Sequence, residues 1–182
     1  MAVRKVLRMG NPILRKQARE LSHEEILNSQ ELIQDMFDTM AVEQGIGIAA
    51  PQIGESVQAA IIHIPENNPR YPSSHESNKY IIFNPKIIIL DEQLQGFWEG
   101  CLSVPGLRGF VERPRKIKIN YKDEKAQNCE IEFEGFLATV FQHELDHLFG
   151  ILYIDRIKDL TKLSYIEEFS QFILKDEDKS IE

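Results

Sequence analysis

The sequence has little cysteine and no long apolar run. Its 182 residues include only two cysteines, Cys101 and Cys129, whereas secreted chains of this size often carry more, at the spacing of a disulfide framework. Aliphatic runs such as Ile87 to Leu90 are far too short to cross a bilayer. The first residues, MAVRKVLRMGNPILRKQ, lack the apolar segment of a signal peptide. These absences predict a cytoplasmic protein that makes no use of a membrane.

The sequence also contains fewer basic than acidic residues. Lysine and arginine number 21 against 29 aspartate and glutamate, and the net charge is -8 at pH 7. This balance argues against a protein that recognises nucleic acids or anionic membrane surfaces by electrostatics. No internal repeat is visible, and the length suits one domain with a sizeable core. We expect a single domain over residues 1–174 and a charged, flexible tail over 175–182.

Apolar side chains at helical spacing predict three helices: one near the N-terminus, a second that precedes Gly150, and a third near the C-terminus. Ser22 followed by Glu25 has the form of a capping box, which marks the start of the first helix. Gly150 is placed to end the second helix. The helices expected are an N-terminal helix over 23–42, a helix over 136–149, and a C-terminal helix that begins at Asp159 or Thr161 and runs to about Leu174.

Runs rich in β-branched residues predict strands. The segment GIGIAAPQIG, residues 45–54, contains glycine and proline and is expected to be a loop or a bent strand. The polar, proline-rich segment 65–79 is expected to be a mobile loop. The strands expected are 57–64, 80–90, 116–121 and 128–133. Because these strands are followed by helices and do not alternate with them, the predicted class is α+β.

The segment FQHELDH, residues 141–147, places four ionisable groups inside an apolar run. Burying charge is costly unless the charge is paired or bound to a metal. His143 and His147 are four residues apart, so both imidazoles lie on one helix face and can bind one ion. Glu144 lies about 100° further around the helix and can reach a water molecule at that ion. This is the HExxH arrangement of metallohydrolases, with the glutamate as general base.

The identity of a third ligand is open on spacing alone. The extended motif HExxHxxGxxH fails, because Tyr153 occupies its last position. Glu167 would make the protein a metallopeptidase with a glutamate as third ligand. Cys101 would supply a thiolate and leave a fourth position for water. A closed structural zinc site would need a fourth protein ligand, for which Cys129 is the only other thiol.

Three motifs together resemble those of bacterial peptide deformylases, in the order found in that family. The resemblance covers most of the chain, from about Val6 to Ile157. It implies an α+β catalytic domain in which antiparallel β-sheets pack around a central helix that carries HExxH, with an N-terminal and a C-terminal helix. The motifs are Gly45-Ile46-Gly47-Ile48-Ala49-Ala50-Pro51-Gln52, Glu99-Gly100-Cys101-Leu102-Ser103 and Gln142-His143-Glu144-Leu145-Asp146-His147.

The resemblance selects Cys101, His143 and His147 as ligands of one divalent metal ion. It implies Fe²⁺ in the cell, with Zn²⁺, Ni²⁺ or Co²⁺ able to replace it, since imidazole and thiolate suit several of these ions. The implied reaction is removal of the N-formyl group from the formylmethionine of nascent chains, with release of formate. The ribosome near its exit tunnel is a further candidate partner.

The resemblance also implies roles for other residues. Glu144 would take a proton from water and later pass it to the leaving amine. The Gln52 side-chain amide and the Leu102 backbone N–H would stabilise the oxyanion. Glu99 is expected to pair with Arg113 and brace the site. The residues expected to contact substrate are Ile46, Gly47, Gly100, Arg108, Thr139 and Val140.

Overall fold

The computed structural model describes residues 2–64 and 78–174, so the predicted tail and nearly all of the predicted mobile loop lie outside the described residues. The helices of this part of the chain are α1 (His23–Leu27), α2 (Gln30–Val42), α3 (Gly135–Asp146) and α4 (Ile166–Glu168). The strands are β1 (Gly47–Ala49), β2 (Ala59–Ile62), β3 (Tyr80–Cys101), β4 (Val104–Lys122), β5 (Asn128–Glu134) and β6 (Leu163–Tyr165). None of the described helices is long and apolar enough to span a bilayer.

Short helical turns connect several of these elements. The 3-10 helices are η1 (Pro12–Arg15), η2 (Ala50–Ile53), η3 (His147–Phe149), η4 (Tyr153–Arg156) and η5 (Leu160–Lys162), and η6 (Phe169–Ile173) is a π-helical turn.

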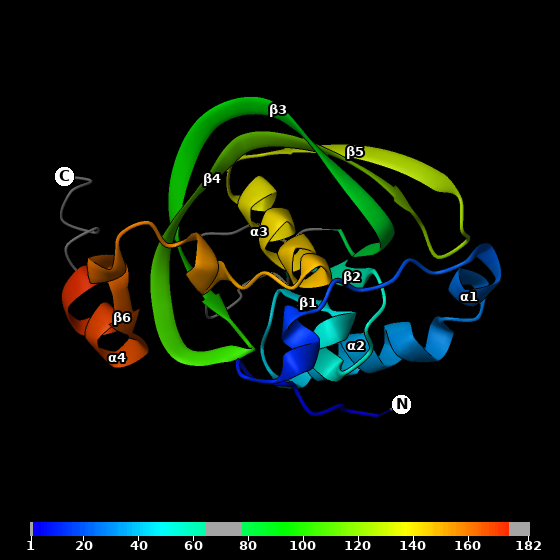
Figure 1. Ribbon diagram of the computed structural model, residues 1–182, viewed down its shortest axis with the longest axis horizontal. Coiled ribbons are helices and arrows are strands. Elements are labelled where there is room, and N and C mark those ends of the chain that lie inside the picture. Colours follow the sequence, from blue (N-terminus) through cyan, green and yellow to red (C-terminus); the bar gives the residue numbers. More distant parts are fainter. Residues whose placement is uncertain (1, 65–77, 175–182) are drawn as a thin grey trace.

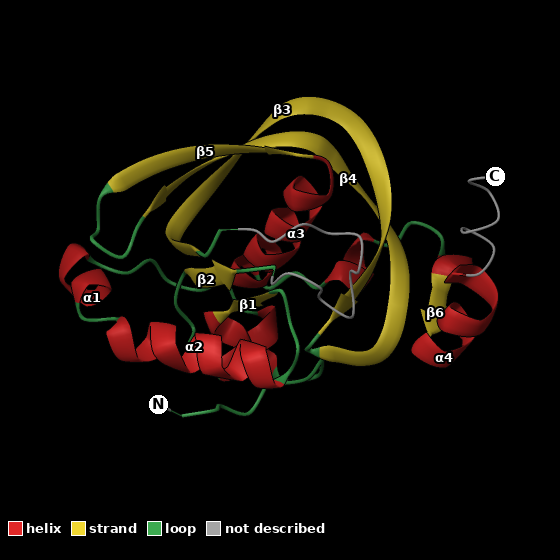
Figure 2. Ribbon diagram, turned by 180° about the vertical axis from the view of Figure 1, so that it is seen from behind, coloured by secondary structure: helices red, strands yellow, loops and turns green. Residues whose placement is uncertain are grey.

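The described strands form one six-stranded antiparallel sheet in the order β1-β2-β3-β4-β5, and β6 pairs with β4. β3 and β4 are long, and together they arch over α3 (Figure 1). α2 lies on the other side of β1 and β2, and the view from behind shows the same order (Figure 2). The sheet therefore encloses α3, as expected for a central helix in an α+β fold.

β2 is buried on both of its faces. Ala60 and Ile62 pack in one core cluster with side chains of α3. Ala59 and Ile61 pack in a second cluster with side chains of α2. Because successive side chains of a strand point to opposite faces, one short strand can serve both clusters. The layers of this half of the molecule are thus α2, sheet and α3.

α3 is buried along most of its length. Every residue from Ala138 to Asp146 is buried, including polar side chains that would cost free energy without partners. The helix predicted over 136–149 is present as α3 and the 3-10 turn η3 that follows it. Gly150 has φ 73°, a left-handed conformation that glycine adopts without a steric penalty, and it ends the turn as predicted.

The predicted N-terminal helix over 23–42 is two helices, and the prediction of one continuous helix is wrong. The capping box is present, since Ser22 Oγ accepts from Glu25 N–H and the Glu25 carboxylate accepts from Ser22 N–H. The break follows from two polar side chains. Asn28 Nδ2 donates to Glu24 O at 2.9 Å and Ser29 Oγ donates to Ile26 O at 2.6 Å. The Ser29 hydroxyl occupies a carbonyl that a continuing helix would use, and the Asn28 side chain adds a second contact to Glu24 O, which already accepts from the Asn28 N–H.

Further boundaries differ from the prediction. The strand predicted over 116–121 is the end of β4, which begins at Val104. The strand predicted over 80–90 continues as β3 to Cys101. The C-terminal helix does not begin at Asp159 or Thr161, because Asp159 caps only the short turn η5 and β6 follows, paired with β4. The C-terminal α-helix, α4, begins at Ile166. Pairing with a distant strand outweighs local helix propensity at β6.

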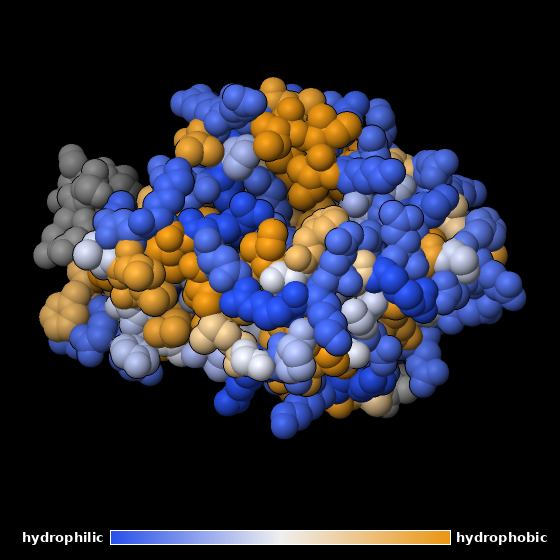
Figure 3. All heavy atoms as spheres, in the orientation of Figure 1, coloured by the Kyte–Doolittle hydropathy of each residue, from blue (hydrophilic) through white to orange (hydrophobic). Residues whose placement is uncertain are grey.

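The arch of β3 exposes apolar side chains. Ile88 is 44% exposed and Ile89 is 51% exposed, and an apolar patch lies at the top of the molecule in Figure 3, with hydrophilic side chains on both sides of it. β3 also has register shifts against β4, for example between Ile89 and Asp91. Such bulges bend and twist a strand, so β3 curves over α3 and brings its C-terminal end back toward that helix.

Candidate active site

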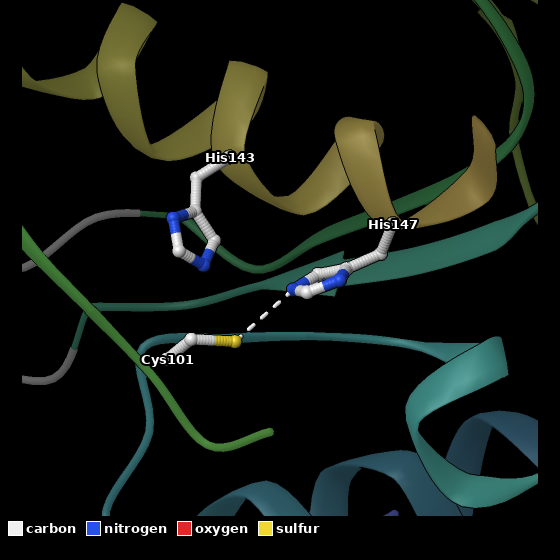
Figure 4. Close-up of side chains that lie close together, drawn as sticks. All are labelled: Cys101, His143 and His147. Atoms are coloured by element: carbon white, nitrogen blue, oxygen red, sulfur yellow. Dashed lines mark hydrogen bonds between the residues drawn. The ribbon is translucent and has the colours of Figure 1, made fainter. Parts of the chain in front are cut away.

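Cys101 is the last residue of β3, where the strand turns tightly into β4. His143 lies in α3, and His147 begins the turn after it. The two imidazoles point toward the Cys101 sulfur (Figure 4). Cys101 Sγ lies 3.3 Å from His147 Nε2, and one ligand atom of each residue lies within 4.8 Å of the others. The structure therefore brings together the three residues named as metal ligands.

The donor set fits one metal ion. His143 Nδ1 lies 2.7 Å from Glu99 Oε2, and a hydrogen bond there leaves Nε2 with its lone pair free for a metal. Burial opposes ionisation of the Cys101 thiol, but the adjacent imidazole of His147, with that of His143, holds its pKa well below the ordinary value. A thiolate and two imidazoles are a familiar ligand set for catalytic zinc and related ions.

Glu144 gives independent support for a bound polar group. Its carboxylate is buried beside the three donors, and within the described residues Oε2 has no hydrogen-bond partner. Buried carboxylate oxygens are nearly always hydrogen-bonded. Burial raises the pKa of Glu144 above its ordinary value. A water molecule held at the metal would supply the partner that this oxygen lacks.

Glu99 and Arg113 form the expected ion pair. Arg113 Nε and Nη2 donate to the two Glu99 oxygens at 2.7 and 3.0 Å. Burial opposes the charge on Glu99, but hydrogen bonds from His143 and Arg113 outweigh it and lower its pKa to about 2. Glu99 is therefore an anion that holds His143 in one orientation.

Gln52 is oriented by both ends of its amide. Its Oε1 accepts from Ala49 N–H at 2.8 Å. Its Nε2 lies 3.1 Å from Ser103 Oγ and 3.6 Å from Cys101 Sγ. The amide nitrogen thus lies in contact with the sulfur of the metal-binding group. Ser103 was not predicted as part of the site, although it closes the motif that contains Cys101.

Two adjoining hollows open at these residues. The first is lined by Gly45, Ile46, Gly47, Gln52, Gly100, Cys101, Leu102, His143 and Glu144. The second is lined by Ile46, Phe97, Trp98, Glu99, Gly100, Phe136, Thr139, Val140, His143 and Glu144. The aromatic residues Phe97, Trp98 and Phe136 were missed by sequence reasoning. The first two directly precede Glu99, so their place beside the motif was the available signal.

At two glycines in the wall of the first hollow, any side chain would force a neighbouring side chain to move. A Cβ atom built on Gly47 would lie 2.6 Å from the Glu144 carboxylate, and one built on Gly100 would lie 2.1 Å from Arg108 Nη1. Distances under 3 Å are incompatible with a normal contact. Arg108 is thus packed against Gly100 and buried, although it is not among the residues that line either hollow in the described part of the chain.

The other candidate ligands lie elsewhere. Glu167 is exposed on α4, and Cys129 is half-buried in β5, where it faces Tyr121 of β4. In the described residues the group of potential metal ligands consists of Cys101, His143 and His147 alone. The structure thus gives no support to a glutamate as third ligand or to a closed site with two thiolates.

Comparison with known proteins agrees with the site. Residues 3–163 match the polypeptide deformylase family model. A peptide deformylase of Leptospira biflexa is 48% identical over 170 residues, which is 92% of this chain and 95% of that protein. Peptide deformylase 1 of Bordetella pertussis is 48% identical over 162 residues, 89% of this chain and 92% of that protein.

Solved structures of peptide deformylases are also similar to this one. The Met-Ala-Ser bound class I type b peptide deformylase of Acinetobacter baumannii has a TM-score of 0.79 and 41% identity, covering 86% of this chain and 99% of that one. The peptide deformylase of Thermotoga maritima has a TM-score of 0.77 and 34% identity, covering 87% of this chain and 100% of that one. The chain belongs to the peptide deformylase family, hydrolases that remove the N-formyl group from nascent polypeptides.

Proposed function

We propose that this chain hydrolyses the formyl amide of N-terminal formylmethionine, with Cys101, His143 and His147 as ligands of one divalent metal. The observation that carries the proposal is the convergence of these three donors beside a buried Glu144 oxygen that has no hydrogen-bond partner among the described residues. When bound, the metal would acidify a water molecule and polarise the formyl carbonyl. Fe²⁺ is the proposed ion in the cell, with Zn²⁺, Ni²⁺ or Co²⁺ able to replace it, because the donor types suit each of them.

Glu144 is the proposed general base and then the general acid. Its carboxylate takes the proton from the attacking water and delivers it to the amine as the C–N bond breaks. The burial that raises its pKa brings it closer to the working pH, as both roles require.

The proposed oxyanion donors are the Gln52 amide and the Leu102 backbone N–H. The Gln52 amide is held by Ala49 at one end, so its N–H groups need no reorientation during the reaction. Donors that are already in place stabilise developing charge without a reorganisation cost.

The proposed substrate lies along β1 with its methionine side chain in the second hollow. In the described residues β1 is an outer strand of the sheet, so its free edge near Gly47 can pair with an extended peptide. The aromatic and aliphatic side chains of the second hollow suit a thioether chain. Ile46, Thr139 and Val140 lie there, while Gly100 and Arg108 are proposed to meet the peptide backbone. The Met-Ala-Ser bound to the Acinetobacter relative supports a peptide that begins with methionine.

The cellular setting follows from the substrate. Formylmethionine occurs at the start of newly made chains, so we propose that the enzyme acts in the cytoplasm, close to the exit of the ribosome. Co-sedimentation with ribosomes that carry a nascent chain, compared with empty ribosomes, tests this setting.

The direct test is formate release from formyl-Met-Ala-Ser under anaerobic conditions with Fe²⁺. We expect Glu144→Gln to lower kcat by about 10²- to 10⁴-fold, because it removes general acid–base catalysis, while its metal content stays that of the wild type. Cys101→Ala should lose the metal, because a ligand is gone. Cys129→Ala is the matched control and should behave as the wild type. A fully metal-loaded wild type that releases no formate would refute the proposed reaction.

A further inference from the structure

A network of charged side chains connects the protein surface to the metal-binding group. Arg156, in η4, places Nε 2.5 Å from Asp146 Oδ2 and Nη2 2.5 Å from Asp146 Oδ1. Asp146 Oδ2 also accepts from Arg113 Nη1 at 2.8 Å. Arg113 in turn holds both oxygens of Glu99, and Glu99 contacts His143 Nδ1. Asp146 and Arg156 were given no role by the sequence.

The positive and negative charges of this network are equal in number only when Arg156 is included. The side chains of Arg113 and Glu99 are 2% and 5% exposed, and that of Asp146 is 9% exposed. Two buried carboxylates thus share one buried guanidinium, which leaves one negative charge without a partner. Burying an unpaired charge is strongly unfavourable. Arg156, whose side chain is 41% exposed, supplies the second positive charge from the protein surface.

Arg113 stands between two competing carboxylates. Asp146 Oδ2 accepts hydrogen bonds from both Arg113 and Arg156. The exposed guanidinium of Arg156 therefore neutralises part of the negative charge on Asp146. Without Arg156, Asp146 would attract Arg113 more strongly, and the Arg113 guanidinium would move away from Glu99. Glu99 would then hold the His143 ring less firmly, since its own orientation depends on the paired contacts with Arg113.

We propose that Arg156 is a positioning residue for His143, because it holds Asp146 and thereby leaves Arg113 free to fix Glu99 against the imidazole. The inference rests on the proposed function, in which His143 is a metal ligand. The turn that carries Arg156 is itself held by apolar packing. Leu152 and Tyr153, at the start of its turn, are buried in the same apolar cluster as Cys101.

The test is the affinity of the protein for metal, measured without substrate. Zn²⁺-loaded wild type and Arg156→Ala are titrated with a chromophoric chelator. We expect the variant to bind Zn²⁺ about tenfold more weakly, at the low end of the 10- to 100-fold range for residues that directly support a ligand. Arg15→Ala is the matched control: Arg15 is 41% exposed and pairs with Asp155, the neighbour of Arg156. It should keep the wild-type affinity.

Two further variants separate positioning from a general loss of stability. Arg156→Lys keeps the charge but not the two-pronged contact, so its affinity should fall between those of wild type and Arg156→Ala. In an Asp146→Asn background, Arg156→Ala should add little, because the residue acts through Asp146. The visible absorption of the Co²⁺-loaded protein should change with Arg156→Ala and stay unchanged with Arg15→Ala, since it reports the geometry of the ligands.

Wild-type affinity and an unchanged Co²⁺ spectrum in Arg156→Ala would overturn the proposal, even if that variant melts at a lower temperature. An effect of equal size in the Asp146→Asn background would also overturn it. Formate release by the wild type, measured in parallel, tests the proposed function separately, because metal affinity is read without the reaction.

Discussion

At Gly47 the chain leaves no room for a side chain beside the proposed base. The Glu144 carboxylate occupies the space where a Cβ atom would lie, at 2.6 Å. The same residue borders the free edge of β1, where the substrate backbone is proposed to pair. One glycine therefore serves two needs: the position of the base and the approach of the peptide.

We predict that Gly47→Ala lowers kcat about 10²-fold while the metal content stays unchanged. The added methyl group must push Glu144 out of place, and a displacement of about 1 Å in a reacting group costs this much. Steady-state kinetics and metal analysis of the purified variant are the measurements.

Gly45→Ala is the control in the same loop. Its Cβ would meet Leu102 Cδ1 at 3.1 Å and Met40 Cγ at 3.3 Å. These contacts need only small shifts of the two side chains, so the loss of activity should be much smaller. Wild-type kcat in Gly47→Ala would mean that Glu144 does not need the position seen here.

At the scale of elements, α1 depends on its cap. The helix has only five residues, too few to be stable without help. Ser22 and Glu25 satisfy two backbone N–H groups at its start, and Ile26 is buried in the cluster with α2. The cap therefore fixes how the first helix enters the core.

We predict that Ser22→Ala lowers the free energy of unfolding by about 1 kcal/mol, the usual cost of losing such a cap. For a chain of this size the expected fall in Tm is roughly 2–4 °C. Thermal denaturation of the metal-loaded enzyme is the measurement. Ser22→Thr, which keeps the oxygen acceptor, should stay close to wild type, and equal losses in both variants would contradict the capping role.

Local elements of the site were predictable, while distant pairings were not. His143 and His147 are a local pair, so their spacing alone indicates a shared ion. Cys101 required the family resemblance, because its position depends on the register of β3 against β4. The contact between Asp146 and Arg156 had no sequence signal, since spacing does not reveal which acid meets which base.

The same limit explains the errors in the fold. β3 beyond Leu90 reads DEQLQG, a polar stretch in which exposed and half-exposed residues follow one another without a buried face. β6 forms only because β4 offers a pairing edge at Leu107 to Gly109. Neither feature has a local cause.

At the scale of the whole molecule, the fold does not rest on the metal site. The two larger core clusters pair α2 and α3 with the sheet through aliphatic and aromatic side chains. A third, smaller cluster contains Cys101 and borders the site. Most of the buried apolar surface is thus independent of the three ligands.

We therefore predict that removal of the metal lowers Tm but leaves the enzyme folded. A ligand present at about a thousand times its Kd stabilises the native state by roughly 4 kcal/mol, which corresponds to a fall of about 10 °C on removal. Circular dichroism before and after dialysis against a chelator is the measurement. An apoprotein that is unfolded at 25 °C would instead indicate a structural metal, as in small zinc domains.

The arch of β3 and β4 also has a consequence for the order of folding. The two imidazoles share one short segment and come together as soon as α3 forms, whereas Cys101 reaches them only after two long strands have paired and curved over the helix. The contact of Cys101 with His147 joins residues 46 positions apart, and such a contact forms slowly because loop closure must precede it. A refolding chain thus has a weak two-histidine site early and a complete three-ligand site late. The moment at which tight metal affinity appears marks the closing of the arch.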